Sequence, residues 1–217
     1  MKLIDKLLYW FTGRLPCRII SDDGKPYLER YHLGTLLGVR FYIHRFVGSD
    51  PARGLHDHPW LWAGSLVLSG WYWEERRGTE QHAITRVLAA LCGTTGIVRR
   101  KVRWFNWLTG DSFHRVVLPK NEQRLIATVT ASGVSFEEED KPCWTLFFHR
   151  ASYTKPWGFL RTVSDDPQLI WVPHNYPKDG TGTPGAWWNE KPTGNFEPRR
   201  QPLRGPQKFT PAQHIKP

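Results

Sequence analysis

Cysteine is scarce in this sequence, with only Cys17, Cys92 and Cys143 among 217 residues. The count is odd and the spacing matches no metal-binding pattern, so the sequence predicts neither a disulfide framework nor a zinc ribbon. Thiols without disulfide partners are typical of proteins in a reducing compartment. We therefore predict a cytoplasmic protein.

Long uninterrupted apolar runs are also absent. The most apolar segment near the N-terminus, residues 1–13, is interrupted by Asp5 and Lys6 and is too short and too charged to span a membrane. No small-residue cleavage site follows it, so a signal peptide is not predicted either. We interpret the segment as a short amphipathic helix that docks its apolar face on the domain, with attachment to a membrane surface as the less favoured alternative. No membrane partner is expected.

Acidic residues are fewer than basic ones: 20 Asp and Glu stand against 30 Lys and Arg, a formal charge of +10. Such an excess can signal a polyanionic partner. The basic residues are dispersed, however, and a solvated strand face explains the densest cluster, at 99–103. Nucleic-acid binding is therefore not the function we favour. Gly-rich phosphate loops, nucleophile elbows and cysteine-centred catalytic patterns are also missing, and those enzyme classes are set aside.

Short segments compatible with β-structure dominate what is present. Within residues 38–46, Val39, Phe41 and Ile43 alternate with polar side chains, which is the pattern of a strand with one buried face. Further apolar stretches lie at 65–74, 85–90, 98–107, 114–118, 124–129 and 143–148. Many short strands at turn-punctuated intervals, with no long amphipathic helix after the first residues, predict an all-β sandwich or barrel.

We divide the chain into three parts. Residues 1–24 hold the N-terminal amphipathic helix and its lead-in, residues 25–160 form the β-barrel, and residues 161–217 form an extended tail rich in proline, aromatic and basic residues. Proline blocks regular structure in the tail. Aromatic residues are unusual in a free linker, so part of the tail is expected to pack along the barrel or, in the alternative, along a partner.

The strongest local signal for chemistry is the pair His56 and His58. Residues at i and i+2 of a strand project to the same face, so both imidazoles can reach one metal ion. His114 follows a turn that returns the chain to the sheet, and it is expected to supply a third ligand. Three neutral imidazoles leave coordination positions for water, substrate or dioxygen and suit Fe, Mn, Ni, Cu or Zn. The alternative is that the histidines before Pro59 only hydrogen-bond a turn.

These residues resemble the two motifs of the cupin superfamily: a His-x-His pair near a strand start, a strand at 65–70 closing on glycine, and Gly-Asp-Ser-Phe-His-Arg-Val at 110–116. The resemblance covers residues 27–160 and implies a small jelly-roll barrel with the metal ligands on its inner face. More narrowly, segments at 27–30, 44–45, 55–60, 65–70, 143–147 and 157–159 are similar to uncharacterised cupin-like proteins often encoded by bacteriophages and prophages. The compartment would then be the host cytoplasm.

One departure from the cupin pattern concerns a carboxylate. Where the family usually places a glutamate, this chain has Trp62 and Ala63. The three histidines that remain are similar to the site of thiol dioxygenases of the same superfamily, which implies a divalent metal, Fe(II) before Mn, Ni or Zn. Two alternatives stay open: loss of the metal altogether, or a carboxylate from another strand, for which Glu29, Glu74 and Glu75 are the candidates.

Two further residues are candidates for positioning a substrate. Arg115, next to His114, can bind an anionic group through charge-assisted hydrogen bonds. His44 lies on the polar side of its strand, where it can point into the pocket, although a core or surface histidine is the commoner case. We assign His56, His58 and His114 to the metal and Arg115 and His44 to the catalytic positions, and we expect no organic cofactor.

The resulting hypothesis is a metal-binding cupin, a non-haem metal-dependent oxygenase acting on a small molecule. The second hypothesis is a non-catalytic module, either ligand-binding or a phage structural or accessory protein, that uses its tail for assembly with a second copy or a phage protein. The missing glutamate and the long tail favour the second hypothesis, and the histidine motif favours the first.

Overall fold

The computed structural model describes residues 2–77, 97–130, 133–152, 154–163, 166–174 and 186–203. One α-helix is followed by strands, and a short 3-10 helix lies near the end of the described chain. The elements are α1 (Leu3–Thr12), β1 (Cys17–Asp22), β2 (Lys25–Leu36), β3 (Val39–Phe46), β4 (Leu55–His56), β5 (Trp62–Ser69), β6 (Tyr72–Arg77), β7 (Ile97–Val102), β8 (Phe105–Thr109), β9 (His114–Val117), β10 (Lys120–Thr130), β11 (Gly133–Asp140), β12 (Cys143–Arg150), β13 (Gly158–Val163), β14 (Asp166–Pro173) and η2 (Trp187–Asn189).

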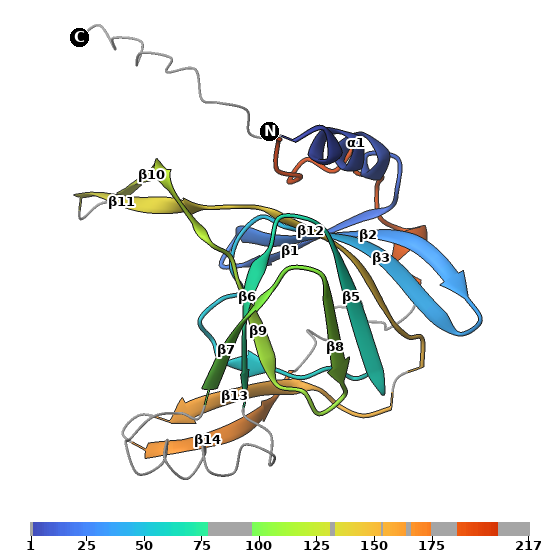
Figure 1. Ribbon diagram of the computed structural model, residues 1–217, viewed down its shortest axis with the longest axis vertical. Coiled ribbons are helices and arrows are strands. Elements are labelled where there is room, and N and C mark those ends of the chain that lie inside the picture. Colours follow the sequence, from blue (N-terminus) through green and yellow to red (C-terminus); the bar gives the residue numbers. More distant parts are fainter. Residues whose placement is uncertain are drawn as a thin grey trace, which may run out of the picture.

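Two six-stranded antiparallel sheets form the body of the molecule. One sheet has the order β1-β2-β3-β12-β5-β8 and the other β14-β13-β4-β9-β6-β7. In Figure 1, α1 lies at one end of this body and the hairpin of β13 and β14 at the other, while the hairpin of β10 and β11 projects to the side. The predicted all-β jelly-roll barrel with a short N-terminal helix is confirmed.

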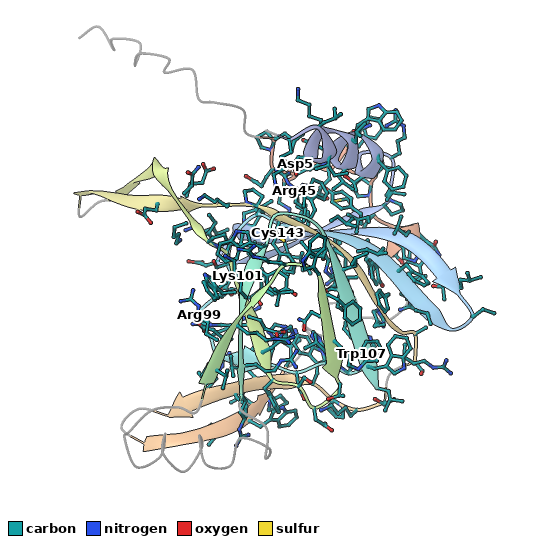
Figure 2. All side chains as sticks on the ribbon, viewed as in Figure 1. Asp5, Arg45, Arg99, Lys101, Trp107 and Cys143 are labelled. Carbon is teal, nitrogen blue, oxygen red and sulfur yellow. The ribbon has the colours of Figure 1, made fainter. Side chains whose placement is uncertain are left out.

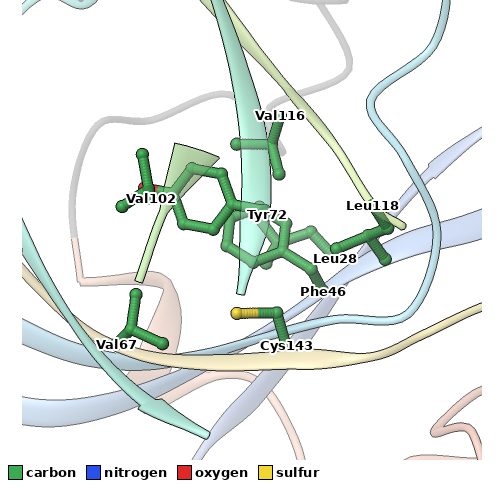
Figure 3. Packing of buried hydrophobic residues seen from close by; sticks show 8 residues of the cluster. All are labelled: Leu28, Phe46, Val67, Tyr72, Val102, Val116, Leu118 and Cys143. Atoms are coloured by element: carbon green, nitrogen blue, oxygen red, sulfur yellow. The ribbon is translucent and has the colours of Figure 1, made fainter. Parts of the chain in front are cut away.

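Apolar residues at alternate positions hold the two sheets together. The interior cluster joins Phe46 of β3 to Tyr72 of β6 and Cys143 of β12, with further members from both sheets. Figure 3 shows all eight residues of this cluster: Leu28, Phe46, Val67, Tyr72, Val102, Val116, Leu118 and Cys143. Each fully buried side chain of this size contributes roughly 1.5–3 kcal/mol to stability. The cluster fills one end of the space between the sheets and leaves the other end to the polar site.

Gly64 of β5 leaves room for the ring of Phe148 on the neighbouring strand β12. A Cβ atom at this position would lie 2.6 Å from Cζ of Phe148 on the neighbouring strand β12. The ring therefore covers the backbone of β5 directly. A larger residue here would force Phe148 or the strand to shift.

Helix α1 docks in a way that corrects the sequence-based expectation. Its contacts with the domain come from Leu8 and Tyr9, which pack beside the cluster around Trp144, and from Thr12, which is fully buried. Leu8 packs on the domain as the apolar pattern of the segment predicts, but the other apolar residues of this pattern face solvent: Leu3, Ile4, Leu7, Trp10 and Phe11 are 40% to 72% exposed. On its docked side, α1 also binds Arg200, which donates to the Tyr9 carbonyl and to Thr12 Oγ1.

The segment from residue 186 to 203 lies against the barrel and α1. Arg45 of β3, labelled below α1 in Figure 2, donates to the carbonyl oxygens of Gln201 and Pro202 at 2.6 and 3.0 Å. The Gln201 amide in turn donates to Glu29 at 2.6 Å, and Glu29 pairs with Arg45 in a fully buried ion pair. Packing of part of the tail on its own barrel is thus confirmed for these residues.

Regular structure extends beyond both expected boundaries of the barrel. β1 pairs with β2 before residue 25, and β14 pairs with β13 after residue 160. The expectation that the tail is extended from residue 161 onward is corrected for β14. The physical reason is local: residues 169–172 are Leu, Ile, Trp and Val, which favour a strand despite the prolines around them.

Two remaining expectations concern membranes and cysteines. Within the part of the chain that the structure describes, no helix has both the length and the apolar character needed to cross a bilayer. Cys17 and Cys143 are buried free thiols, and burial raises the pKa of each to about 12. Cys92 lies outside the described residues, as do the strand expected at 85–90 and most of the tail.

Candidate metal centre

Three histidines from two parts of the chain meet between the sheets. His56 ends β4, His58 follows two residues later, and His114 begins β9, where its backbone is paired with that of His56. One ring nitrogen from each residue lies within 4.8 Å of the other two. The structure therefore brings together all three predicted ligand residues.

Asp57 explains why the two neighbouring histidines share a direction. Its backbone amide donates to the Gly158 carbonyl at 3.1 Å, and its carboxylate accepts the Gly158 amide at 2.6 Å and Lys155 Nζ at 2.8 Å. Asp57 is 1% exposed and points away from the cluster into the chain before β13. Alternation along the extended backbone then sends His56 and His58 to the opposite side.

Glu74 of β6 holds His114 from behind. Nδ1 of His114 lies 3.0 Å from Oε1 of Glu74, whose side chain is fully buried. A carboxylate in this position accepts the Nδ1 proton and leaves Nε2 with its lone pair directed at the cluster. Burial alone would raise the pKa of Glu74, but the hydrogen bond with His114, the Arg76 guanidinium and Asn106 hold that pKa below its ordinary value. Glu74 therefore remains an anion.

The charges around Glu74 are balanced by a local network. Arg100 Nε lies 2.6 Å and Arg76 Nη2 3.1 Å from Oε2 of Glu74, and Asn106 Nδ2 donates to Oε1 at 2.6 Å. Asn106 also donates to the Tyr72 hydroxyl at 3.1 Å. Every approach to the carboxylate is thus taken by a donor, which fixes its position beside His114.

The donor set of the cluster fits a divalent transition metal. Burial lowers the pKa of His56 and of His58 well below the ordinary value, as do the neighbouring histidines and the charge of Arg30. Both rings are therefore neutral at physiological pH, which is the state that ligates a metal. Nε2 of His58 lies 2.9 Å from Nε2 of His114. Two nitrogen lone pairs at this distance repel each other unless a proton or a cation lies between them.

The three histidines form part of the wall of a cavity of about 350 Å³. This volume lies in the range of small-molecule sites. His44 of β3 also faces the cavity, as expected, and it is 3% exposed. Arg30 of β2, its cross-strand partner, donates from Nε to Nε2 of His44 at 3.1 Å. Burial lowers the pKa of His44 well below its ordinary value, and Arg30 acts in the same direction.

Aromatic stacking closes one side of the cavity. The Trp60 ring lies between two imidazoles, with its centroid 4.9 Å from that of His58 and 3.7 Å from that of His149, and both pairs are stacked. Phe147 stacks on His44 with centroids 4.6 Å apart. Because these rings contact both sheets, they hold His44 and the three-His cluster in one site.

Arg115 lies on the other side of β9 from His114. Its Nε donates to Oε2 of Glu75 at 2.6 Å, and it is not among the described residues that line the cavity. Successive residues of a strand face opposite sides, so adjacency to His114 carries Arg115 away from the site. Its role in positioning a substrate stays a prediction, and the geometry gives it no support.

The basic residues of β7 form contacts with other side chains of the same chain. Arg99 and Arg100 approach Glu75 and Glu74, and Lys101 lies over the Trp71 ring with its Nζ 3.7 Å from the centroid. Figure 2 places the labelled Arg99 and Lys101 on one outer side of the barrel. These contacts agree with a solvated strand face.

Sequence reasoning named Glu74 only as one of three candidate metal ligands and did not identify Arg30. Glu74 could have been identified from its position in the strand, because it lies two residues after Tyr72 and so shares the inward face of β6. A carboxylate on an inward face needs a partner. Arg30 could have been found only from the pairing of β2 with β3, which places it opposite His44.

Comparisons with known proteins give structural similarity alone. No family model matches the sequence, and no curated protein matches it. Among solved structures, a cupin-2 domain protein from Rhodospirillum rubrum is 13% identical with a TM-score of 0.39, over 65% of this chain and 72% of the other. The iron(II) form of HppE is 8% identical with a TM-score of 0.38, over 64% of this chain, which spans 57% of the HppE chain. An oxalate oxidase is 12% identical with a TM-score of 0.35, over 60% and 53%. The similarity is weak in sequence and in superposition, so the function is inferred from the site itself.

Proposed function

We propose that this protein is a metal-dependent enzyme that acts on a small molecule, with His56, His58 and His114 holding one divalent metal ion. The observation that carries the proposal is the convergence of three imidazole nitrogens within 4.8 Å at the wall of a cavity of about 350 Å³. Three protein ligands are typical of catalytic metal sites, which keep a coordination position open, whereas structural sites are closed by four.

The roles of the surrounding residues follow from their contacts. Glu74 orients His114 and raises its basicity as a ligand, because its carboxylate accepts the Nδ1 proton. Asp57 fixes the backbone that carries His56 and His58. His44, held neutral by burial and by Arg30, accepts a hydrogen bond from Arg30 Nε at its Nε2 and contributes to the cavity wall on the first sheet, where it would contact the substrate.

Fe(II) is the metal we favour, and oxygenation is the reaction class we propose. Neutral imidazole ligands suit iron, zinc, copper and nickel, and the three-His resemblance to thiol dioxygenases favours iron. When bound, the metal would supply Lewis acidity and coordination positions that the protein leaves open. Trp60 and Phe147 line the cavity, and their rings would limit the access of bulk water to the metal.

The decisive experiment is elemental analysis of protein purified without added metal or chelator. Wild type is compared with the double variant His56→Ala, His114→Ala and with His32→Ala as a matched control, because His32 stacks on Trp188 away from the cavity wall. Stoichiometric metal in wild type and in His32→Ala, and none in the double variant, supports the proposal. A folded wild type that neither contains nor takes up Fe, Mn, Ni or Zn overturns it.

The non-catalytic alternative has less support from the described part of the tail. Residues 186–203 are bonded to the barrel and to α1 through Arg45, Glu29 and Arg200, so this part of the tail packs on its own domain. Phage origin, a cytoplasmic location and self-association stay predictions.

A further inference from the structure

The cavity wall is positively charged. Four arginines line it, Arg18, Arg30, Arg40 and Arg53, whereas Asp50 is the single carboxylate among the described residues of the wall. Asp50 is already engaged, because its Oδ2 accepts the Val116 amide at 2.8 Å. Arg53 is also paired with Asp22, which lies outside the wall, at 3.0 Å. The wall itself therefore carries more guanidinium groups than carboxylates.

Two rows of cross-strand neighbours face each other across this space. On the first sheet, Arg30 of β2 is paired with His44 of β3, and His44 with Thr145 of β12. On the second sheet, His56 of β4 is paired with His114 of β9. All five residues line the same cavity. Because facing sheets pack about 10 Å apart, one small molecule can contact both rows.

Arg30 is held in place within the first row. Its Nε donates to His44, its guanidinium carbon lies 5.5 Å from the centre of the Tyr42 ring, and Phe147 fixes His44 from the other side. A guanidinium restrained in this way loses little side-chain entropy when it binds a planar anion.

Several hydrogen-bonding atoms of the wall have no partner within the protein. Buried polar atoms without a hydrogen bond include Thr145 Oγ1, Trp60 Nε1, Arg40 Nε and Ser21 Oγ, all on residues that line the cavity. The indole and guanidinium nitrogens only donate, and the hydroxyls can donate. An unpaired buried donor is costly, and a ligand rich in acceptors would supply the missing partners.

We propose that the cavity binds a small organic oxyanion, with Arg30 as the anchoring residue and Thr145 as an additional donor. Carboxylate and phosphoryl groups share the required chemistry, since each offers several acceptor oxygens and negative charge to a guanidinium. The anion would span the two rows, from Arg30 and Thr145 on the first sheet to the three-His cluster on the second. This inference rests on the proposed function only for the metal end of the ligand.

The test is calorimetric titration of the protein as purified with three probes: succinate, inorganic phosphate and the neutral analogue succinamide. Wild type is compared with Arg30→Gln, Arg30→Lys and Thr145→Val. Arg103→Gln is the matched control. Arg103 is exposed and does not line the cavity, so this substitution removes the same charge outside the site. Far-UV circular dichroism and melting temperature verify that each variant is folded. The near-isosteric Thr145→Val keeps the test available if Arg30→Gln does not fold.

We expect succinate or phosphate to bind and succinamide not to bind. Arg30→Gln should weaken anion binding at least about tenfold, Arg30→Lys less, and Thr145→Val about three- to tenfold. Arg103→Gln should change it less than about twofold at 0.15 M salt. The preferred probe tells whether the natural group is a carboxylate or a phosphoryl group.

The inference is overturned if neither anion binds at about 10 mM, if succinamide binds as tightly as succinate, or if the folded Arg30 and Thr145 variants bind as wild type does. Elemental analysis of the same samples separates this result from the metal proposal. Anion binding that depends on Arg30 in protein without metal supports the inference while the metal proposal fails. Stoichiometric metal without anion binding supports the metal proposal and overturns the inference of an anion site.

Discussion

Nδ1 of His114 lies 3.0 Å from Oε1 of Glu74, a carboxylate on the neighbouring strand whose side chain is completely buried. The contact selects the tautomer of His114 that has a lone pair on Nε2, the atom that faces His58. The candidate metal centre therefore depends on a residue that does not itself belong to the ligand cluster.

Replacing Glu74 should weaken metal binding without removing a ligand. We expect Glu74→Leu to lower metal affinity by roughly 10- to 100-fold, because His114 loses its orienting acceptor. Glu74→Gln keeps an acceptor oxygen and should have a smaller effect. The measurement is competition with a chromophoric chelator. Glu75→Gln is the control, because Glu75 pairs with Arg115 and Arg99 and not with a histidine of the cluster. Equal losses for the Glu74 and Glu75 variants would contradict the role of Glu74.

Asp57 should be needed for the backbone that presents His56 and His58. Asp57→Ala leaves the buried Gly158 amide without its 2.6 Å acceptor, and we expect a loss of roughly 1–3 kcal/mol in the free energy of unfolding. Urea denaturation measures it. Asp111→Ala removes the other carboxylate that binds Lys155, but Asp111 is 89% exposed, so its loss should be barely measurable. A similar cost for both variants would mean that only the lysine contact matters.

The ion pair between Arg45 and Glu29 should be sensitive to removal of either partner. Their side chains are 2% and 0% exposed. Arg45 also donates to the carbonyls of residues 201 and 202, and Glu29 accepts the amide of residue 201. Arg45→Met leaves a buried carboxylate without its cation, which costs roughly 3–5 kcal/mol. Chemical denaturation should show this loss. Asp22→Asn breaks the half-exposed pair with Arg53 and should cost less than about 1 kcal/mol. A cost near zero for Arg45→Met would show that the C-terminal segment does not depend on this pair.

Stability should fall in acid because His149 is buried as a neutral ring. Burial, with the charges of Arg30 and Arg40, lowers the pKa of His149 to about 3, against an ordinary value of 6.5. The unfolded chain therefore binds the proton first, and the contribution of this residue is complete above pH 6.5 and is lost progressively as the pH falls toward 3. Its slope is at most about 1.4 kcal/mol per pH unit.

The variant His149→Asn isolates this contribution. Asn keeps a donor for the Arg150 carbonyl, which Nδ1 of His149 contacts at 2.7 Å, but it does not titrate. Its unfolding free energy, measured between pH 7 and pH 4, should decline less steeply than that of wild type, whatever its value at pH 7. Parallel declines would show that His149 is not responsible, and that other buried histidines such as His44 dominate the acid response.

The sequence carried much of the fold and the ligand set. Alternating apolar residues predicted the strands around residues 39–46, 65–74 and 143–148, because a strand between a core and another surface must alternate. The spacing of His56 and His58 predicted a shared direction for the same reason. Rules of this kind depend only on residues that are close in the sequence, so these strands and the shared direction of His56 and His58 could be predicted without knowing the tertiary structure.

Other features were decided by the packing of distant segments. Most apolar residues of α1 face solvent, while Leu8 packs on the domain and Arg200, from the far end of the chain, binds the Tyr9 carbonyl. Arg115, adjacent in sequence to His114, is directed to Glu75 by strand alternation, while Arg30 reaches His44 from a strand 14 residues earlier. The sequence by itself determined the shared direction of His56 and His58 and the all-β class, since both follow from backbone periodicity. Only the tertiary structure decided that Glu74 supports His114 and that Arg30 faces the cavity, because both contacts depend on which strands become neighbours.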